Sequence, residues 1–321
     1  MLNIFKQFNK IKNSAFFTAE NKIQQPLITH KEILDLSFQV KGNKTPSQYK
    51  NEIAFKQIGD VRSIYRGHGM DYEESRRYQT GDDPRYMNWQ LSARTGQHYM
   101  KVFREEKQPG VFILIDRRHP MRFGTRQRLK ITQAIRTAAI AAFTAQENNY
   151  SIGGVIIDDE VEWFKESKSK QAAFNLINHA ARPARPLLDK EINEQNINKV
   201  LLMLNEVLTT GSTLYLISDF HDLDESSQST LLQLSAAHQI NAIQITDIAE
   251  VKLPDAGLIS LKSSENSKQQ QLNSSSLLQQ EMYQSAADEY FTNKKSLFED
   301  IAIPYQTILT TDKEIDLKIA L

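Results

Sequence analysis

Carboxylate and imidazole side chains follow three apolar stretches in the second half of the chain. VFILID ends in Asp116, STLYLISD in Asp219 and INAIQITD in Asp247. If these stretches are neighbouring strands of a parallel sheet, the polar groups at their carboxyl ends meet at one edge. The group expected to meet there comprises Asp116, His119, Asp219, His221 and Asp222. Carboxylate oxygens favour Mg²⁺ and imidazoles shift the preference to a transition metal, so a metal-dependent hydrolase of phosphate esters is one hypothesis.

A structural interpretation of the same aspartates competes with this hypothesis. Aspartate after a strand is also common as a helix N-cap or a turn residue. The sequence offers no nucleophile with a base beside it, which weighs against hydrolysis. The acidic run at 158–160 predicts only a hairpin turn.

A second group of reactive side chains lies in RRYQTGDDPRYMNWQLSART, residues 76–95. Gly81 and Pro84 around Asp82 and Asp83 are typical of a turn. Residues 60–107 hold nine Lys/Arg and eight Asp/Glu, and arginine pairs well with carboxylates and stacks on aromatic rings. This balance favours an internal or interfacial charge network, with a binding surface as the second interpretation. Catalysis by the two aspartates is the weakest, because adjacent side chains point apart and no histidine or nucleophile accompanies them.

The elements that position these groups follow from hydrophobic periodicity. We expect strands at 111–116, 151–158, 161–166, 212–219, 240–247 and 304–311, and helices at 125–148, 168–181, 193–209, 225–237 and 276–300. Continuous apolar strands alternating with amphipathic helices predict a doubly wound α/β domain with a mostly parallel sheet. The strand at 161–166 returns antiparallel at one edge, and the polar stretch 257–275 predicts a surface hairpin or loop.

The sequence divides into three parts. Residues 1–25 form a basic tail, in which Ile4, Phe8 and Ile11 recur at helical spacing between lysines. Residues 26–110 form a smaller region with a helix at 29–40 and strands near 61–66 and 98–105. Residues 111–321 form the α/β domain. Residues 1–16 are suited to peripheral contact with an anionic membrane, but docking of the tail on protein is the preferred interpretation.

Composition excludes several classes of function. The 39 Lys+Arg balance 39 Asp+Glu, which argues against nucleic-acid binding. The absence of cysteine excludes disulfides, Cys-zinc sites and thiol nucleophiles. No apolar run approaches the roughly 20 residues of a membrane span, and a secretory signal is missing. We therefore expect a soluble cytoplasmic protein.

The stretch YRGHGMDYEESRRYQTGDDPRYMNWQLSARTGQHYMKVFREE, continuing into VFILIDRRHPMRFGTR, resembles the bacterial domain of unknown function 58 family. The resemblance is nearly continuous over residues 65–126 and weaker towards the C-terminus. It implies a von Willebrand factor A-like fold and action with a MoxR-type AAA+ ATPase in assembly or maturation of other complexes. The segment departs from the family pattern at Asn88, where the family usually has aspartate.

The resemblance also implies a metal-ion-dependent adhesion site, in which an Asp-x-Ser-x-Ser loop and a later aspartate hold Mg²⁺. Asp116 and Asp219 match the two aspartates, but Arg118 and Pro120 replace the serines. Proline has no side-chain ligand, and an arginine would repel the cation. We therefore predict a degenerate site in which Arg118 pairs with Asp116, with no cofactor and only weak residual affinity for Mg²⁺.

These observations predict a non-enzymatic protein-interaction module, with the metal-dependent hydrolase as the alternative. The expected partners are a MoxR-type AAA+ ATPase and von Willebrand A-type proteins. The residues expected to form the interaction or structural motif are Arg66, Gly67, Gly69, Arg77, Tyr78, Gly81, Asp82, Asp83, Arg85, Trp89 and Arg94.

Overall fold

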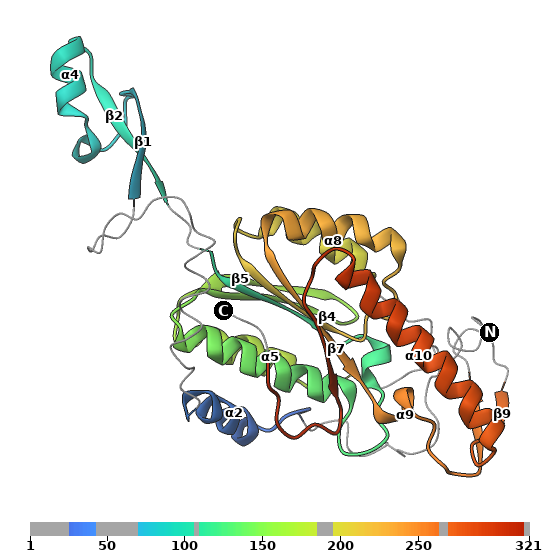
Figure 1. The fold of residues 1–321 in the computed structure, drawn as a ribbon. Coiled ribbons are helices and arrows are strands. Elements are labelled where there is room, and N and C mark those ends of the chain that lie inside the picture. The colour runs from blue at the N-terminus through green and yellow to red at the C-terminus, as the bar shows by residue number, and fades with distance from the viewer. Residues whose placement is uncertain (1–25, 43–69, 106–108, 185–194, 263–268, 318–321) are drawn as a thin grey trace. The chain divides into compact units, whose positions relative to one another are not determined.

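The computed structural model describes residues 26–42, 70–105, 109–184, 195–262 and 269–317. The chain divides into two compact units (Figure 1). One comprises residues 1–45 and 109–321, and the other residues 46–108. Residues 1–16, the strand near 61–66 and the motif positions Arg66, Gly67 and Gly69 lie outside the described residues.

The larger unit is built on a six-stranded sheet of order β10-β7-β6-β3-β4-β5. Five strands are parallel and β5 pairs antiparallel with β4, so the predicted mostly parallel sheet with one antiparallel edge strand is confirmed. Its strands are β3 (Val111–Asp116), β4 (Ile152–Ile157), β5 (Val161–Ser167), β6 (Thr213–Ser218), β7 (Gln239–Thr246) and β10 (Tyr305–Leu309).

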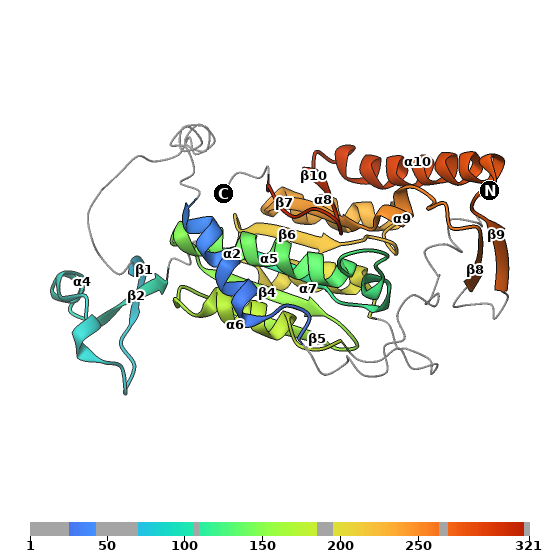
Figure 2. The ribbon, with the colours of Figure 1, turned by 90° about the horizontal axis from the view of Figure 1, so that it is seen from below.

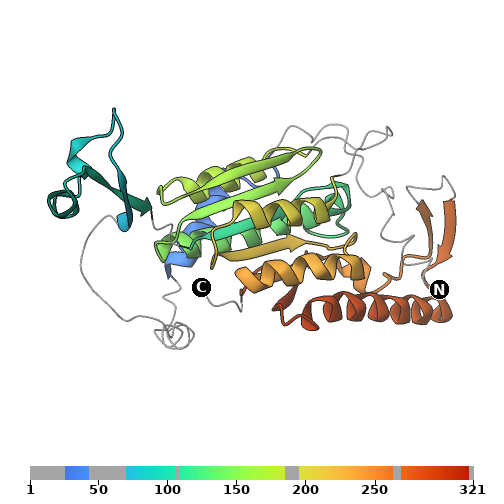
Figure 3. The same ribbon diagram turned by 90° about the horizontal axis from the view of Figure 1, so that it is seen from above.

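Helices cover both faces of this sheet because each central strand is apolar on both sides. Along β3, Ile113 and Ile115 enter one hydrophobic core and Phe112 and Leu114 enter the other. Figure 2 shows α2 and α5 in front of the sheet, and Figure 3 shows α7 and α8 in front of the opposite face, with α10 along the edge of the sheet. The first core packs under α2 (His30–Gly42), α5 (Lys130–Glu147) and α6 (Ala172–Ala180), and the second under α7 (Ile197–Val207), α8 (Glu225–Ala237) and α10 (Leu277–Glu299).

Helix α2 belongs to the sheet unit rather than to the small β region with which the sequence analysis grouped it. Its buried Ile33 and Leu36 join the first core. Its Glu32 pairs with Arg136 of α5 at 3.0 Å. The apolar face of the helix therefore sets its placement, which its position in the sequence did not reveal.

A short hairpin and two short helices complete the sheet unit. The polar stretch predicted as a hairpin or loop forms the antiparallel pair β8 (Leu258–Lys262) and β9 (Gln269–Asn273). The 3-10 helix η3 (His119–Arg122) follows β3, and the short helix α9 (Ile248–Val251) follows β7. Among the described residues, no helix is long and apolar enough to cross a membrane.

The described part of the smaller unit is a β-hairpin with helical turns between its strands. Strand β1 (Met70–Arg77) pairs antiparallel with β2 (Tyr99–Glu105). Between them lie the 3-10 helix η2 (Pro84–Tyr86) and the helix α4 (Trp89–Thr95). The strand expected near 98–105 is confirmed as β2, whereas β1, η2 and α4 were not predicted. Strand β1, MDYEESRR, lacks the apolar alternation by which a strand is recognised.

Candidate functional site at the carboxyl ends of the strands

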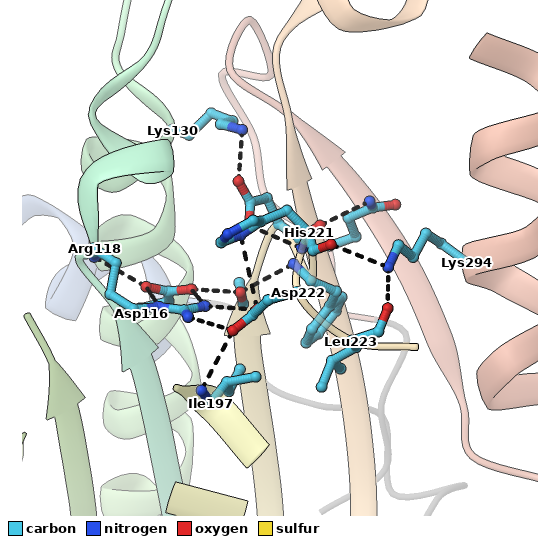
Figure 4. A network of polar contacts seen from close by, with 12 residues as sticks. Asp116, Arg118, Lys130, Ile197, His221, Asp222, Leu223 and Lys294 are labelled. Atoms are coloured by element: carbon cyan, nitrogen blue, oxygen red, sulfur yellow. Dashed lines mark hydrogen bonds and ion pairs between the residues drawn. The ribbon is translucent and has the colours of Figure 1, made fainter. Parts of the chain in front are cut away.

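Strands β3 and β6 are neighbours, and the loops that follow them meet at one edge of the sheet. Figure 4 shows Asp116 and Arg118 from the end of β3 beside His221 and Asp222 from the loop after β6. The expected meeting of Asp116 with Asp222 is therefore found, and Asp219 bonds His221 in the same loop. His119 is buried at the start of η3.

Arg118 is the centre of the first polar network. Its Nε and Nη2 donate to the two oxygens of Asp116 at 3.0 and 2.7 Å. Its Nη1 and Nη2 donate to Asp222 at 2.6 and 3.0 Å, and Nη1 also donates to the carbonyl of Gln195 at 3.0 Å. A guanidinium has five N–H donors, so these five bonds use all of them. Burial lowers the pKa of Arg118, but the two carboxylates outweigh it and hold that pKa well above its ordinary value.

Asp116 is equally saturated. Besides the guanidinium, it accepts from the backbone N–H of Arg118 at 3.0 Å and from the hydroxyl of Ser218 at 2.6 Å. The predicted Asp116–Arg118 ion pair is confirmed. An ionised carboxylate accepts about four hydrogen bonds, and Asp116 accepts four. The residues therefore do not fit a divalent cation, because the charge and donors of Arg118 fill the space between the two carboxylates. Among the described side chains, no three His, Asp or Glu are grouped to hold a metal.

A second buried cation, Lys130, lies at the start of α5. Its Nζ contacts Asp219 at 2.8 Å and Glu250 of α9 at 2.7 Å. Burial alone would raise the pKa of Asp219, but Lys130 and then His221 hold it well below its usual value. Burial raises the pKa of Glu250. Lys130 and Glu250 were not predicted, because the helix was expected to begin at residue 125 and no local pattern connects Lys130 with the distant carboxylates.

His221 connects the two networks. Its Nδ1 lies 3.1 Å from Asp219 and 3.7 Å from Asp222. Burial lowers the pKa of His221 and Arg118 opposes its charge, but Asp219 and then Asp222 outweigh both and raise the pKa above its ordinary value. A raised pKa means that the folded protein holds the imidazole proton more tightly than the unfolded chain does.

We therefore expect a pH-dependent contribution of His221 to stability. This contribution is fully present below the pKa that His221 has in the unfolded chain. It is lost as pH rises through the pKa that His221 has in the folded protein. Urea denaturation of wild type and His221→Gln over this range measures it. The free-energy difference between the two proteins should shrink towards alkaline pH. A constant difference would mean that the imidazole is not protonated in the fold.

Two other helices hold the loop after β6. The backbone N–H of Ile197, in the first turn of α7, donates to Asp222 at 3.4 Å. Lys294 of α10 donates to the carbonyls of His221 and Leu223 (Figure 4). The loop is thus held by α7 and α10 as well as by Arg118 and Lys130.

Asp247, at the end of β7, is a structural residue. It is the N-cap of α9, accepting from the backbone N–H of Ala249 at 3.0 Å. It also accepts from the hydroxyls of Thr125 and Thr310. The capping interpretation is therefore confirmed for this aspartate.

Residues 158–160 form the predicted hairpin turn between β4 and β5, but the expectation that they form only a turn was wrong. Asp158 bonds Arg117 at 3.1 Å and Arg122 at 2.7 Å, and Arg182 lies 3.7 Å away. Arg117 is fully buried and also donates to carbonyls at the C-terminal end of α6, including that of Ala180. Burial lowers the pKa of Arg117 to about 10. The turn therefore anchors buried arginines that the sequence analysis had not assigned.

In the smaller unit the two adjacent aspartates of the motif segment have different partners. Asp82 accepts two hydrogen bonds from Arg76, at 2.6 and 2.9 Å, and one from the backbone of Gln79. Asp83 caps η2 by accepting from the backbone N–H of Arg85 at 3.0 Å. The side chains therefore form no catalytic pair.

Asn88 is the N-cap of α4. Its side chain accepts from the backbone N–H of Leu91 at 3.2 Å and donates to the hydroxyl of Ser75 at 2.9 Å. Asparagine and aspartate cap helices about equally well, which gives the departure from the family pattern a structural reason. Gly96 ends the helix at a φ of 71°, a left-handed conformation that favours glycine.

The comparisons with known proteins agree with the motif. The model of a family described as "Protein of unknown function DUF58" matches residues 74–292. Uncharacterized proteins Rv1480 of Mycobacterium tuberculosis and Mb1516 of Mycobacterium bovis are each 24% identical over 212 residues, spanning 65% of this chain. The match covers 65% of the length of each relative, so it spans slightly less than two thirds of them.

The comparison with solved structures finds two bacterial proteins. The conserved hypothetical protein BatB of Bacteroides thetaiotaomicron has a TM-score of 0.38 and 9% identity, covering 64% of this chain and 92% of that one. An aerotolerance-related membrane protein of Bacteroides fragilis has a TM-score of 0.37 and 12% identity, covering 63% of this chain and 92% of that one.

Proposed function

Since the chain belongs to the DUF58 family of proteins of unknown function, we propose that it is a non-enzymatic protein-interaction module with a von Willebrand factor A-like sheet unit. We further propose that it acts with a MoxR-type AAA+ ATPase, and with von Willebrand A-type proteins, in assembling or maturing other complexes. The partners rest on the motif resemblance of residues 65–126.

The observation that carries the proposal is the saturation of Arg118. All five guanidinium donors are used by Asp116, Asp222 and the carbonyl of Gln195. A site that activated water or bound a substrate phosphate through a cation would need open ligand positions. Here the side chain of Arg118 occupies the positions in which a metal ion would be bound, which supports a function that needs no metal.

The hydrolase alternative depends on the availability of Asp116, Asp219, His119 and His221. Asp219 is bonded by Lys130 and His221, and Asp116 by Arg118 and Ser218. Each carboxylate is thus neutralised by a cation of the chain itself, which disfavours its use as a metal ligand or a general base.

The test measures binding of the purified chain to the MoxR-type ATPase of the same organism by biolayer interferometry. We expect saturable binding that is unchanged when the immobilised chain has been washed with EDTA. Absence of binding would refute the partnership, and loss of binding after the EDTA wash would refute the metal-independent interface.

A parallel assay addresses the alternative. Generic phosphatase and nuclease substrates are offered to the chain with Mn²⁺ or Zn²⁺, and we expect no turnover. Turnover that is abolished by Asp219→Asn would establish the hydrolase and contradict the proposal. The Asp159→Asn variant serves as a control, because Asp159 is partly exposed and lies outside both networks around β3 and β6.

A further inference from the structure

The smaller unit, here the hairpin unit, exposes three of the four Tyr and Trp side chains that the structure describes in it. Among the side chains described between residues 75 and 101, Met100 is the one large apolar residue that is buried. Trp89 is 64% exposed, Tyr86 43% and Tyr78 37%. A two-stranded hairpin is marginally stable in water unless it packs on further apolar surface. These exposed rings therefore add little to the stability of the hairpin, so their exposure calls for an explanation other than folding.

The types of residue on this surface are those that dominate protein–protein binding. Tryptophan, tyrosine and arginine are enriched among the residues that contribute most to interface affinity. Besides the three rings, the segment exposes three arginines, Arg77, Arg85 and Arg94. We call these six residues the hairpin surface.

The charge of the hairpin surface indicates which kind of partner it would bind. Asp82 pairs with Arg76, and Asp83 bonds the backbone N–H of Arg85. The guanidinium groups of Arg77, Arg85 and Arg94 form no ion pair with any residue in the described part of the chain. Complementary charge steers association and fixes register. The three arginines therefore favour a surface that carries carboxylates.

We propose that the hairpin surface binds an acidic segment of another protein, with Trp89 as the apolar anchor and Arg85 and Arg94 as the carboxylate partners. This inference rests on the proposed function and deepens it, since it assigns the interface to the hairpin and not to the rim of the sheet. The rim is a poor candidate because Arg118 has no donor left for a partner. A protein is favoured over nucleic acid because the whole chain carries 39 cationic and 39 acidic residues.

The chain offers matched controls for a test. It has two tryptophans, so Trp163→Ala on the edge strand β5 is the control for Trp89→Ala. For the arginines, Arg85→Glu/Arg94→Glu is compared with Lys199→Glu/Lys313→Glu, which makes the same change in charge at exposed positions of the sheet unit. Circular dichroism confirms that each variant is folded.

The experiment selects a phage-displayed library of random dodecapeptides on the full-length chain and measures the dissociation constants of the enriched peptides by fluorescence polarisation. We expect peptides with net negative charge and at least one large apolar residue. Their affinity should fall at least about tenfold for Trp89→Ala and for the arginine double variant, as for a central interface residue. Both control variants should stay within about twofold of wild type.

Three results would overturn the proposal. These are failure to enrich any peptide, enrichment of peptides without acidic residues, and acidic peptides that bind the hairpin variants as tightly as wild type. Single-stranded DNA and anionic vesicles are run alongside. Tighter binding of either, lost in the same variants, would replace the acidic segment by another class of ligand. If the ATPase binds but Trp89→Ala leaves that affinity unchanged, the hairpin assignment fails while the proposed function stands.

Discussion

Replacing Arg118 by alanine is expected to lower the free energy of unfolding of the sheet unit by about 3–5 kcal/mol. The variant leaves Asp116, which is fully buried, and Asp222 facing one another without the cation that neutralises them. Removing one partner of a buried ion pair is costly because the other charge stays out of water. At about 2–4 °C per kcal/mol for a unit of this size, the melting temperature falls by roughly 6–20 °C. Calorimetry and urea denaturation measure both quantities.

The matched control for Arg118→Ala is Arg182→Ala. Arg182 also contacts carboxylates of the sheet unit, but its side chain is 38% exposed. An exposed ion pair contributes about 0–1 kcal/mol. If the two alanine variants were equally stable, the buried ion pairs of Arg118 would contribute no more to the free energy of unfolding than the exposed ion pairs of Arg182.

A serine at position 118 tests whether the guanidinium stands in for a metal. Arg118→Ser leaves oxygen ligands on Asp116, Asp222 and Ser218 around the space that the arginine fills. A cation that binds only the folded state stabilises it, by about 2.7 kcal/mol at a hundredfold excess over its dissociation constant. We expect Mn²⁺ or Mg²⁺ to raise the melting temperature of the variant and to leave wild type unchanged. No rise would mean that the geometry suits arginine alone.

The sequence was sufficient for the sheet because its signal is local and strong. Continuous apolar runs such as residues 111–116 allow one interpretation, and all six strands were placed within one or two residues of their ends. The pairing of Asp116 with Arg118 was also predictable, since the two residues are separated by one position at the end of a strand. A contact between residues that are close in the sequence can therefore be predicted from a local pattern.

Interactions between distant residues were not predictable in the same way. Lys130 contacts Asp219, 89 positions later, and Glu250, 120 positions later. Nothing in the local pattern links these three residues, and a charged residue at a helix start is usually solvated. The hairpin unit was hard for a different reason. Its strand β1 is polar and its charges balance by count, which concealed that Arg77, Arg85 and Arg94 lack ion-pair partners among the described residues.

Replacing Lys130 by methionine should be as damaging as the loss of Arg118. Methionine keeps the apolar stem of the side chain and removes only the charge. Asp219 and Glu250 then share a buried space without their common cation, so we expect a loss of about 3–5 kcal/mol in the free energy of unfolding. Urea denaturation at neutral pH measures this loss, with Lys295→Met, at an exposed ion pair of α10, as the control.

The pH dependence of the Lys130→Met variant distinguishes charge from packing. In wild type, the pKa of Asp219 is depressed, so its contribution to stability is present above the unfolded aspartate pKa and lost as pH falls through the folded pKa. Without Lys130 the two carboxylates bind protons more readily. The difference in unfolding free energy between wild type and variant should therefore narrow as pH falls. A second variant, Lys130→Met/Glu250→Gln, removes one negative charge together with the cation and should recover part of the stability. Two results together would contradict this account: a difference in unfolding free energy that does not change with pH, and a double variant whose loss of stability equals the sum of the two single losses. They would show that Lys130 acts through packing and that the chain's own cations do not neutralise the carboxylates at the strand ends.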